Sequence, residues 1–244
     1  MTGGEPQVGR DKEPVRISKM FDAIAHRYDL LNHLLSGGLD LYWRARAVHS
    51  IRLDGGETVL DLCTGTGDLA IAASRGRRGA GRVVGVDFSG EMLRFGARKL
   101  IARNLAGRIR LVQGDAMRLP LADGCASAAT VAFGIRNVAD PAVVFADVLR
   151  VLRPGGRFAI LEFGLPRVPG IRQLYLAYFR HVLPRIGRLI SGHTSAYTYL
   201  PASVSTFPEP ARLVSLLESV GFIAARAVPL TFGVVYLYSA RKPA

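Results

Sequence analysis

The most informative segment of the chain is Val59-Leu-Asp-Leu-Cys-Thr-Gly-Thr-Gly-Asp68. Its first four residues predict a short buried strand, and the glycines at 65 and 67 predict a tight turn that a ligand can approach closely. Asp68 then opens an apolar helix. A strand, a glycine turn and a helix N-terminus are typical of a nucleotide-type binding site, although many α/β proteins have a plain tight turn at this point.

Length and composition restrict the class of protein. The chain has 244 residues, of which 49% are hydrophobic and 21% charged, as in a globular protein of one large or two small domains. The sequence shows no apolar run long enough to span a membrane and no secretory signal. Cys63 and Cys125 are the only cysteines, which argues against a disulfide framework or a Cys-rich zinc site. We therefore expect a cytoplasmic location.

The net charge of +13 comes almost entirely from arginine, because lysine occurs only at positions 12, 19, 99 and 242. Nucleic acid and an anionic membrane surface are both plausible partners for such a charge. An Arg-rich codon bias explains the excess equally well.

Alternating patterns predict an α/β domain. We expect residues 1–13 to be a disordered tail and residues 14–244 to form a single domain, with a helical cap over 14–55 that is broken at Gly37-Gly38. From Thr58 onward strands alternate with helices, which predicts a parallel sheet covered on both faces. The first five strands are expected over 59–62, 82–88, 109–112, 126–133 and 158–163.

The last third of the chain departs from this alternation. Residues 164–206 are expected to be a helical insertion on the substrate side, in which positions 171, 174, 175, 178, 182 and 186 share an apolar face. A helix over about 208–220 follows, and residues 222–240 predict two strands joined near Pro229 to Gly233.

Three aspartates stand at consecutive strand ends. Asp87 follows the second strand and can accept hydrogen bonds from ribose hydroxyls, Asp61 precedes the glycine turn, and Asp115 follows the third strand. The dinucleotide pattern G-x-G-x-x-G is matched only partly. Together the three suit a ligand with a cationic amino-acid part, a ribose and an adenine, as in S-adenosylmethionine (SAM), although each alone could be a helix cap or turn residue.

Three motifs make a resemblance specific. They are Lys19-Met-Phe-Asp-Ala-Ile-Ala-His-Arg-Tyr-Asp-Leu-Leu-Asn32, Phe133-Gly-Ile-Arg-Asn137 and His181-Val-Leu-Pro-Arg-Ile-Gly187. From about residue 15 to the end, the chain resembles the ubiquinone/menaquinone C-methyltransferase family (UbiE/MenG), whose fold is the Rossmann-like class I SAM-dependent methyltransferase. The resemblance implies a seven-stranded, mostly parallel sheet with helices on both faces and an antiparallel last strand inserted beside its neighbour.

The resemblance also implies the residues that contact SAM. Cys63 replaces the first glycine of the usual loop, Asp115 stands where some relatives have Asn, and Ala132 stands where relatives may use Ser, so that a contact there would be through backbone. The implied SAM contacts are Asp61, Gly65, Thr66, Gly67, Asp87, Asp115, Ala116 and Ala132.

The implied reaction is C-methylation of a prenylated hydroquinone, with demethylmenaquinol as the substrate, a ubiquinone precursor as an alternative and RNA as a more distant one. Arg136 is expected to stabilise a phenolate and Asn137 to hold a relay water. In the alternative, Arg136 pairs with a local acid such as Asp140 and Asn137 caps a turn. No metal is expected.

The remaining expectations concern the acceptor. His193, Tyr197 and Tyr199 are candidates to line the quinone pocket, with structural roles as the alternative. The segment 171–189 is either a lid over the active site or a contact with the inner face of the cell membrane. A homo-oligomer is left open.

Overall fold

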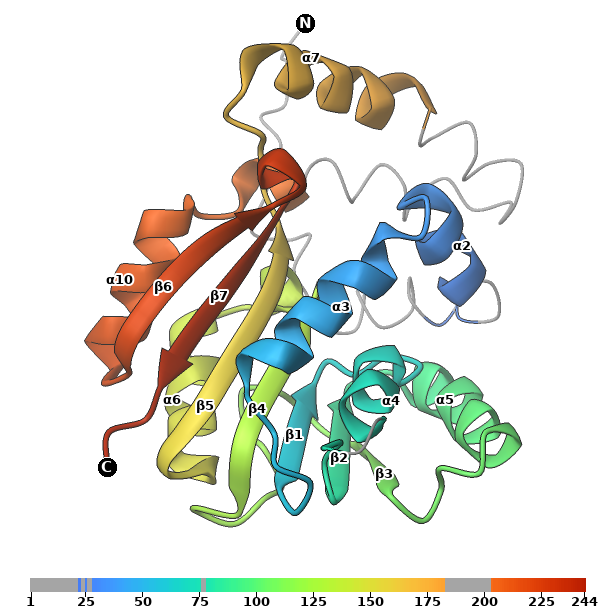
Figure 1. Cartoon of the computed structure of the whole chain (residues 1–244), viewed down its shortest axis with the longest axis vertical. Coiled ribbons are helices and arrows are strands. Elements are labelled where there is room, and N and C mark those ends of the chain that lie inside the picture. The colour runs from blue at the N-terminus through green and yellow to red at the C-terminus, as the bar shows by residue number, and fades with distance from the viewer. Residues whose placement is uncertain (1–21, 23–24, 26–27, 76–77, 183–202) are drawn as a thin grey trace, which may run out of the picture.

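The computed structural model describes residues 22, 25, 28–75, 78–182 and 203–244. A central sheet has the strand order β3-β2-β1-β4-β5-β7-β6 (Figure 1). Strands β1 to β5 pair in parallel, and β7 runs antiparallel between β5 and β6, which confirms the expected class I arrangement. The strands are β1 (Thr58–Leu62), β2 (Arg82–Asp87), β3 (Ile109–Gln113), β4 (Ala126–Ala132), β5 (Leu152–Phe163), β6 (Ile223–Leu230) and β7 (Val235–Arg241).

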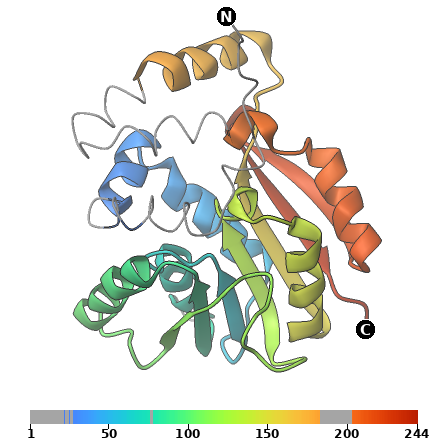
Figure 2. The same cartoon turned by 180° about the vertical axis from the view of Figure 1, so that it is seen from behind.

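Helices cover both faces of the sheet. Figure 1 shows α3 and α4 across one face, and Figure 2 shows α6 on the other. The main helices are α2 (Tyr28–Leu35), α3 (Leu39–Ser50), α4 (Asp68–Ser74), α5 (Gly90–Ala102), α6 (Pro141–Val151), α7 (Pro169–Ala177) and α10 (Pro210–Val220). Short helices follow β4 (η3, Ile135–Asn137), α7 (η4, Tyr178–Val182) and β6 (η5, Thr231–Gly233).

The apolar run of β1 is buried on both faces, as expected of a strand within a parallel sheet. Leu60 and Leu62 join the core cluster that contains Phe145 of α6, while Val59 joins the cluster that contains Trp43 of α3. The sheet therefore holds its glycine turn between two packed layers, at the carboxyl ends of its parallel strands.

Some boundaries differ from those expected. Helix α6 ends at Val151 and β5 begins at Leu152, earlier than the expected 158. Partner β4 pairs Ala126 with Leu152 and then Ala128 with Arg157, so residues 153–156 are accommodated at an irregularity in the ladder. The strand was expected to begin after the Pro-Gly-Gly sequence at 154–156, which instead lies at a bulge inside it.

The expected apolar face of the insertion is only partly buried. Tyr175 is 9% exposed, whereas Leu174 is 73% exposed. The helix also changes to π-helical pitch at Tyr178, which alters the direction of the side chains after it. Residue 186 lies outside the described residues.

Candidate active site

The glycine turn after β1 has an unusual backbone. Gly65 and Gly67 have φ values of 57° and 85°, in the left-handed region that glycine adopts without strain. Cys63 has a φ of 48°, so it holds a conformation that L-residues with a side chain rarely adopt. The replacement of a glycine at position 63 is tolerated, but the backbone there is strained.

Asp61 lies at the end of β1 and is 1% exposed. Its two carboxylate oxygens accept hydrogen bonds from Thr64 Oγ1 at 2.6 Å and Thr130 Oγ1 at 2.8 Å. Burial raises the pKa of Asp61 to about 6, although the two hydroxyls and the charge of Arg44 act in the opposite direction. The carboxylate therefore titrates close to the physiological range.

Asp87 organises the turn from the end of β2. Its oxygens accept hydrogen bonds from the backbone N–H of Gly65 at 2.7 Å and of Ser89 at 2.9 Å. Burial raises the pKa of Asp87 above its ordinary value, and the Asp22 carboxylate adds to that effect. Each carboxylate oxygen has a second lone pair, so Asp87 retains the capacity to accept ribose hydroxyls.

Asp115 is an exposed turn residue in the structure. Its Oδ1 accepts a hydrogen bond from the backbone N–H of Met117 at 2.8 Å. Ala116, beside it, is partly buried against the core. This geometry matches the turn alternative for Asp115 and leaves its role toward an adenine untested.

The N-terminal cap is joined to the glycine turn by a charged network. Thr66 Oγ1 donates to Asp29 Oδ1 of α2 at 2.5 Å. Lys99 of α5 donates to Asp29 Oδ2 at 2.6 Å, to Asp68 Oδ1 at 2.7 Å and to Thr66 Oγ1 at 2.9 Å. Burial opposes ionisation of Asp68, yet the charges of Lys99 and Arg44 and the hydrogen bond from Lys99 together lower the pKa of that carboxyl.

Arg136 and its neighbours form a second cluster after β4. Arg136 is 7% exposed, and its Nη1 donates to Glu162 Oε1 at 2.7 Å and to the carbonyl oxygen of Phe133 at 2.5 Å. Asp140 is not its partner and instead caps α6 through the backbone N–H of Ala142. Arg136 therefore has an acidic partner, as the structural alternative expected, but that partner is the buried Glu162 at the end of β5.

The Arg136 cluster contacts the glycine turn after β1 through the turn Phe133–Gly134. A Cβ added to Gly134 would lie 2.3 Å from the Cβ of Cys63, so only glycine fits against the glycine turn at this point. The Phe133 and Phe163 rings stack with their centroids 4.5 Å apart. The Arg44 guanidinium lies over the Phe133 ring at 5.7 Å, and that of Arg136 lies over the Phe163 ring at 5.4 Å.

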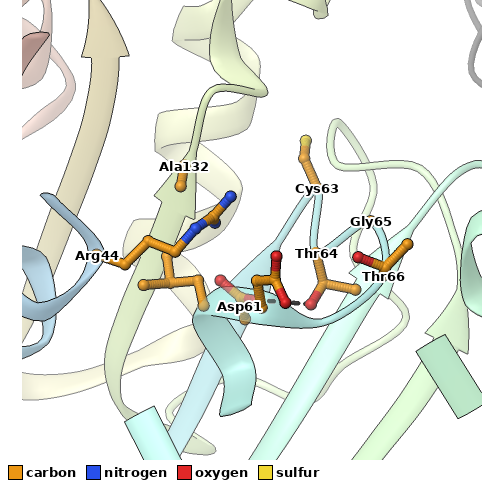
Figure 3. A pocket seen from close by; sticks show the side chains of 9 residues that line it. Arg44, Asp61, Cys63, Thr64, Gly65, Thr66 and Ala132 are labelled. Atoms are coloured by element: carbon orange, nitrogen blue, oxygen red, sulfur yellow. Dashed lines mark hydrogen bonds between the residues drawn. The ribbon is translucent and has the colours of Figure 1, made fainter. Parts of the chain in front are cut away.

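A pocket opens beside the glycine turn, and Figure 3 shows Arg44, Asp61 and Ala132 around it. Its lining consists of Arg44, Asp61, Cys63, Thr64, Gly65, Thr66, Asp68, Leu69 and Ala132. Asp61, Gly65, Thr66 and Ala132 were expected from the sequence, whereas Gly67, Asp87, Asp115 and Ala116 do not line it. His193, Tyr197 and Tyr199 lie outside the described residues.

Four residues of the site were not predicted from the sequence: Arg44, Asp68, Lys99 and Glu162. Lys99 carried a weak signal, because it is one of only four lysines in a chain that otherwise uses arginine. Glu162 carried none, since its partner Arg136 is 26 residues away in sequence.

Known proteins with similar sequences show which family the chain belongs to. Residues 9–242 match the model of the family described as the ubiE/COQ5 methyltransferase family. The chain belongs to this family. It is 46% identical over 224 residues to the demethylmenaquinone methyltransferase of Thermus thermophilus, covering 92% of this chain and 100% of that protein. It is 44% identical over 238 residues to the demethylmenaquinone methyltransferase of Deinococcus radiodurans, covering 97% of each chain.

A third relative is the ubiquinone/menaquinone biosynthesis C-methyltransferase UbiE of Syntrophotalea carbinolica, which is 47% identical over 231 residues, or 95% of this chain and 94% of that protein. Among solved structures, the [4+2]-cyclase SpnF has a TM-score of 0.68 at 18% identity, covering 93% of this chain and 95% of its own. A SAM-dependent methyltransferase from Aquifex aeolicus has a TM-score of 0.60 at 18% identity, covering 94% and 98%. Membership of the family makes this protein a SAM-dependent methyltransferase.

The pocket fits SAM as the methyl donor. It combines acidic side chains, a buried arginine and a glycine turn, and Asp68 Oδ2 is buried without a hydrogen-bond partner, as suits a cationic ligand. Within the described part of the chain, no three His, Cys, Asp or Glu side chains are grouped to hold a metal ion. Within that same part, none of the helices has the length and apolarity to cross a membrane.

Proposed function

We propose that this protein transfers the methyl group of SAM to a ring carbon of demethylmenaquinol and so forms menaquinol. The observation that carries the proposal is Arg136, a buried cation in the turn after β4, which packs against the glycine turn through Gly134 and Cys63. The names of the relatives from Thermus thermophilus and Deinococcus radiodurans support menaquinol over a ubiquinol precursor.

The donor supplies an electrophilic methyl group on its sulfonium, so the protein has to orient the acceptor and manage its protons. A hydroquinone ring carbon is nucleophilic when the neighbouring hydroxyl is ionised. In our proposal Arg136 stabilises that phenolate, and Asn137, at the end of η3, holds a water that takes the ring proton. Glu162 is 0% exposed and paired with Arg136, so we assign it to holding the guanidinium in place.

We assign the acceptor side of the site to the insertion 164–206, including His193, Tyr197 and Tyr199, and the cover of the donor to the cap 14–55. Support comes from Tyr175 of α7, which is buried and close enough to Arg136 and Glu162 for their charges to affect its pKa. Burial raises the pKa of Tyr175 above its ordinary value, so its hydroxyl is a proton donor rather than a base.

The prenyl tail of such an acceptor is too apolar to dissolve freely. We therefore propose that the protein works at the inner face of the cell membrane, held by basic charge and exposed apolar side chains. Leu174 of α7 and Phe232 of η5, 73% and 69% exposed, support this, because Figure 1 shows α7 and the β6–β7 connection at the same end of the molecule.

The test is methyl transfer from methyl-labelled SAM to three acceptors: demethylmenaquinol, a polyprenyl methoxy-benzoquinol and bulk RNA. We expect label in menaquinol, and none when demethylmenaquinone is supplied in its oxidised form, because the oxidised ring has no phenolate. Labelled RNA with unlabelled quinols would refute the proposal, and faster labelling of the methoxy-benzoquinol would move the enzyme to the ubiquinone branch.

A further inference from the structure

Arg44 is a buried cation beside the glycine turn, and the proposed reaction gives it no role. It belongs to α3, is 7% exposed and lines the pocket beside the glycine turn. Figure 3 shows its side chain extending from α3 into the space between Ala132 and Asp61. Its neighbours Trp43 and Ala47 bury the apolar side of α3, so the helix does not need an arginine at this position for its own packing.

One nitrogen of the Arg44 guanidinium lacks a hydrogen-bond partner. Its Nε is buried without a hydrogen-bond partner, and the Asp40 carboxylate with which it is paired is 3.7 Å away. That carboxylate already accepts hydrogen bonds from Ser36 at 2.9 Å and from His33 at 2.7 Å. Because burial of a cation is unfavourable unless its hydrogen bonds are satisfied, a buried nitrogen without a partner calls for an explanation.

A second unsatisfied atom of opposite sign lies in the same pocket. Asp68 Oδ2 is buried without a hydrogen-bond partner, while Oδ1 of the same carboxylate is held by Lys99. Both residues line the pocket, and Arg44 is close enough to contribute to the lowered pKa of Asp68. Two side chains that line the pocket thus carry a guanidinium nitrogen and a carboxylate oxygen without hydrogen-bond partners.

A ligand that satisfies both atoms carries an anion and a cation close together. The methionyl part of SAM has such a pair, an α-carboxylate and an α-ammonium on one carbon. We infer that Arg44 binds the α-carboxylate of the methyl donor, with Asp68 facing the α-ammonium. A guanidinium suits this task because its N–H groups match the two oxygens of a carboxylate.

This inference rests on the methyl donor of the proposed function and is independent of the acceptor. It makes Arg44 a residue that selects for an intact amino-acid tail. Analogues that keep the adenosine and the sulfur but lack the carboxylate should not depend on Arg44.

The experiment is calorimetric titration of SAM and of decarboxylated SAM, without any quinol, into the wild type and into Arg44→Gln. In the wild type we expect SAM to bind about 10- to 100-fold more tightly than the decarboxylated analogue, as for one charge-assisted interaction. In Arg44→Gln we expect that preference to disappear through weaker SAM binding, with the affinity for the analogue changed by less than about threefold.

Two further variants keep the test interpretable. Arg46→Gln removes an exposed arginine of the same helix and should leave both affinities unchanged. Arg44→Lys keeps the charge without the planar group and should retain part of the preference. Thermal melts of the ligand-free proteins should show that Arg44→Gln is folded, so that its affinities can be compared with those of the wild type.

Equal weakening of SAM and of the decarboxylated analogue in a folded Arg44→Gln would overturn the inference and give Arg44 a purely structural role. Unchanged SAM affinity in Arg44→Gln would also overturn it. Because these titrations contain no acceptor, failure of the proposed quinol reaction would leave their outcome unaffected.

Discussion

At the scale of single residues, the carboxylate of Asp61 has the most consequential ionisation. The sign of its effect follows from the raised pKa of about 6, compared with an ordinary value of 3.8. The folded protein holds its proton more tightly than the unfolded chain does. Asp61 therefore lowers the stability of the ligand-free protein as pH rises from the ordinary pKa through about 6, and this cost is absent at lower pH.

A first prediction concerns SAM binding as a function of pH. If ionised Asp61 helps to bind the cationic end of SAM, affinity should be constant above pH about 6 and fall by up to about tenfold per pH unit below it. Titrations at several pH values measure this, and Asp61→Asn should bind more weakly with a flatter profile. A wild-type profile that stays flat below the pKa would exclude Asp61 from binding.

A second prediction concerns Arg136. Replacing Arg136 by Ala would leave the buried Glu162 without its counterion, at a cost of about 3–5 kcal/mol, so that variant confuses stability with chemistry. The double variant Arg136→Gln with Glu162→Gln removes both charges and should fold. We expect it to bind SAM normally and to methylate about 10²- to 10³-fold more slowly in single turnovers, because one stabilising donor is lost.

The control for this prediction is Glu162→Gln alone, which retains the guanidinium but leaves it without its counterion. Once thermal melts have shown that this variant is folded, it should lose much less rate than the double variant. A second control is Arg150→Lys, since Arg150 is also ion-paired but pairs with Asp147 and Asp123 around α6. Normal single-turnover rates in the well-folded double variant would remove Arg136 from the mechanism.

At the scale of elements, two turns from different strands are fitted to each other. Gly134 after β4 approaches the Cβ of Cys63 after β1, and Cys63 has a φ of 48°. Gly134 itself has a φ of −112°, which any residue adopts. Contact between the two turns, and not backbone conformation, is therefore the reason for glycine at position 134.

A third prediction follows for this contact. Gly134→Ala should lower the free energy of unfolding by about 1–3 kcal/mol, as for an overpacked core. Adding Cys63→Gly should recover most of that loss, because it removes the clashing Cβ and relieves the positive φ. Denaturant melts of the two single variants and the double variant measure the coupling. Additive effects would mean that the two turns do not constrain each other.

Sequence patterns predicted the elements well where the signal is local. The strands and the glycine turn follow from apolar runs and from the conformational freedom of glycine. The Lys99 network and the pair of Arg136 with Glu162 join residues that only the strand order brings together. No periodicity in the sequence contains that information, so these contacts could not be predicted.

At the scale of the whole molecule, the proposed membrane contact depends on charge and on exposed apolar side chains. The net charge is +13, and large exposed apolar residues include Leu174 of α7 and Leu30 and Leu34 of α2. Figure 1 shows α7 and α2 in the upper half of the molecule, whereas α5 lies in the lower half. An anionic bilayer would attract the protein through its net positive charge, but only the end with α7 and α2 would insert apolar side chains.

A fourth prediction tests this arrangement. Leu174→Glu should weaken flotation with anionic vesicles by adding a negative charge and removing an apolar contact. Ile101→Glu is the matched control, because Ile101 of α5 is 70% exposed, close to the 73% of Leu174. It adds the same charge elsewhere and should have a smaller effect. Equal loss in both variants would indicate attraction by net charge alone, without a defined docking end.

The position of β7 has a consequence for synthesis of the protein. On the ribosome, β5 emerges long before β7, which then has to enter between β5 and β6 in antiparallel pairing. Until residues 235–241 have been translated, β5 has an open edge of backbone groups and β6 has no neighbour to pair with. While residues 164–234 are being translated, the edge of β5 therefore stays unpaired and prone to aggregation. Pairing with β7 closes that edge and so removes this risk.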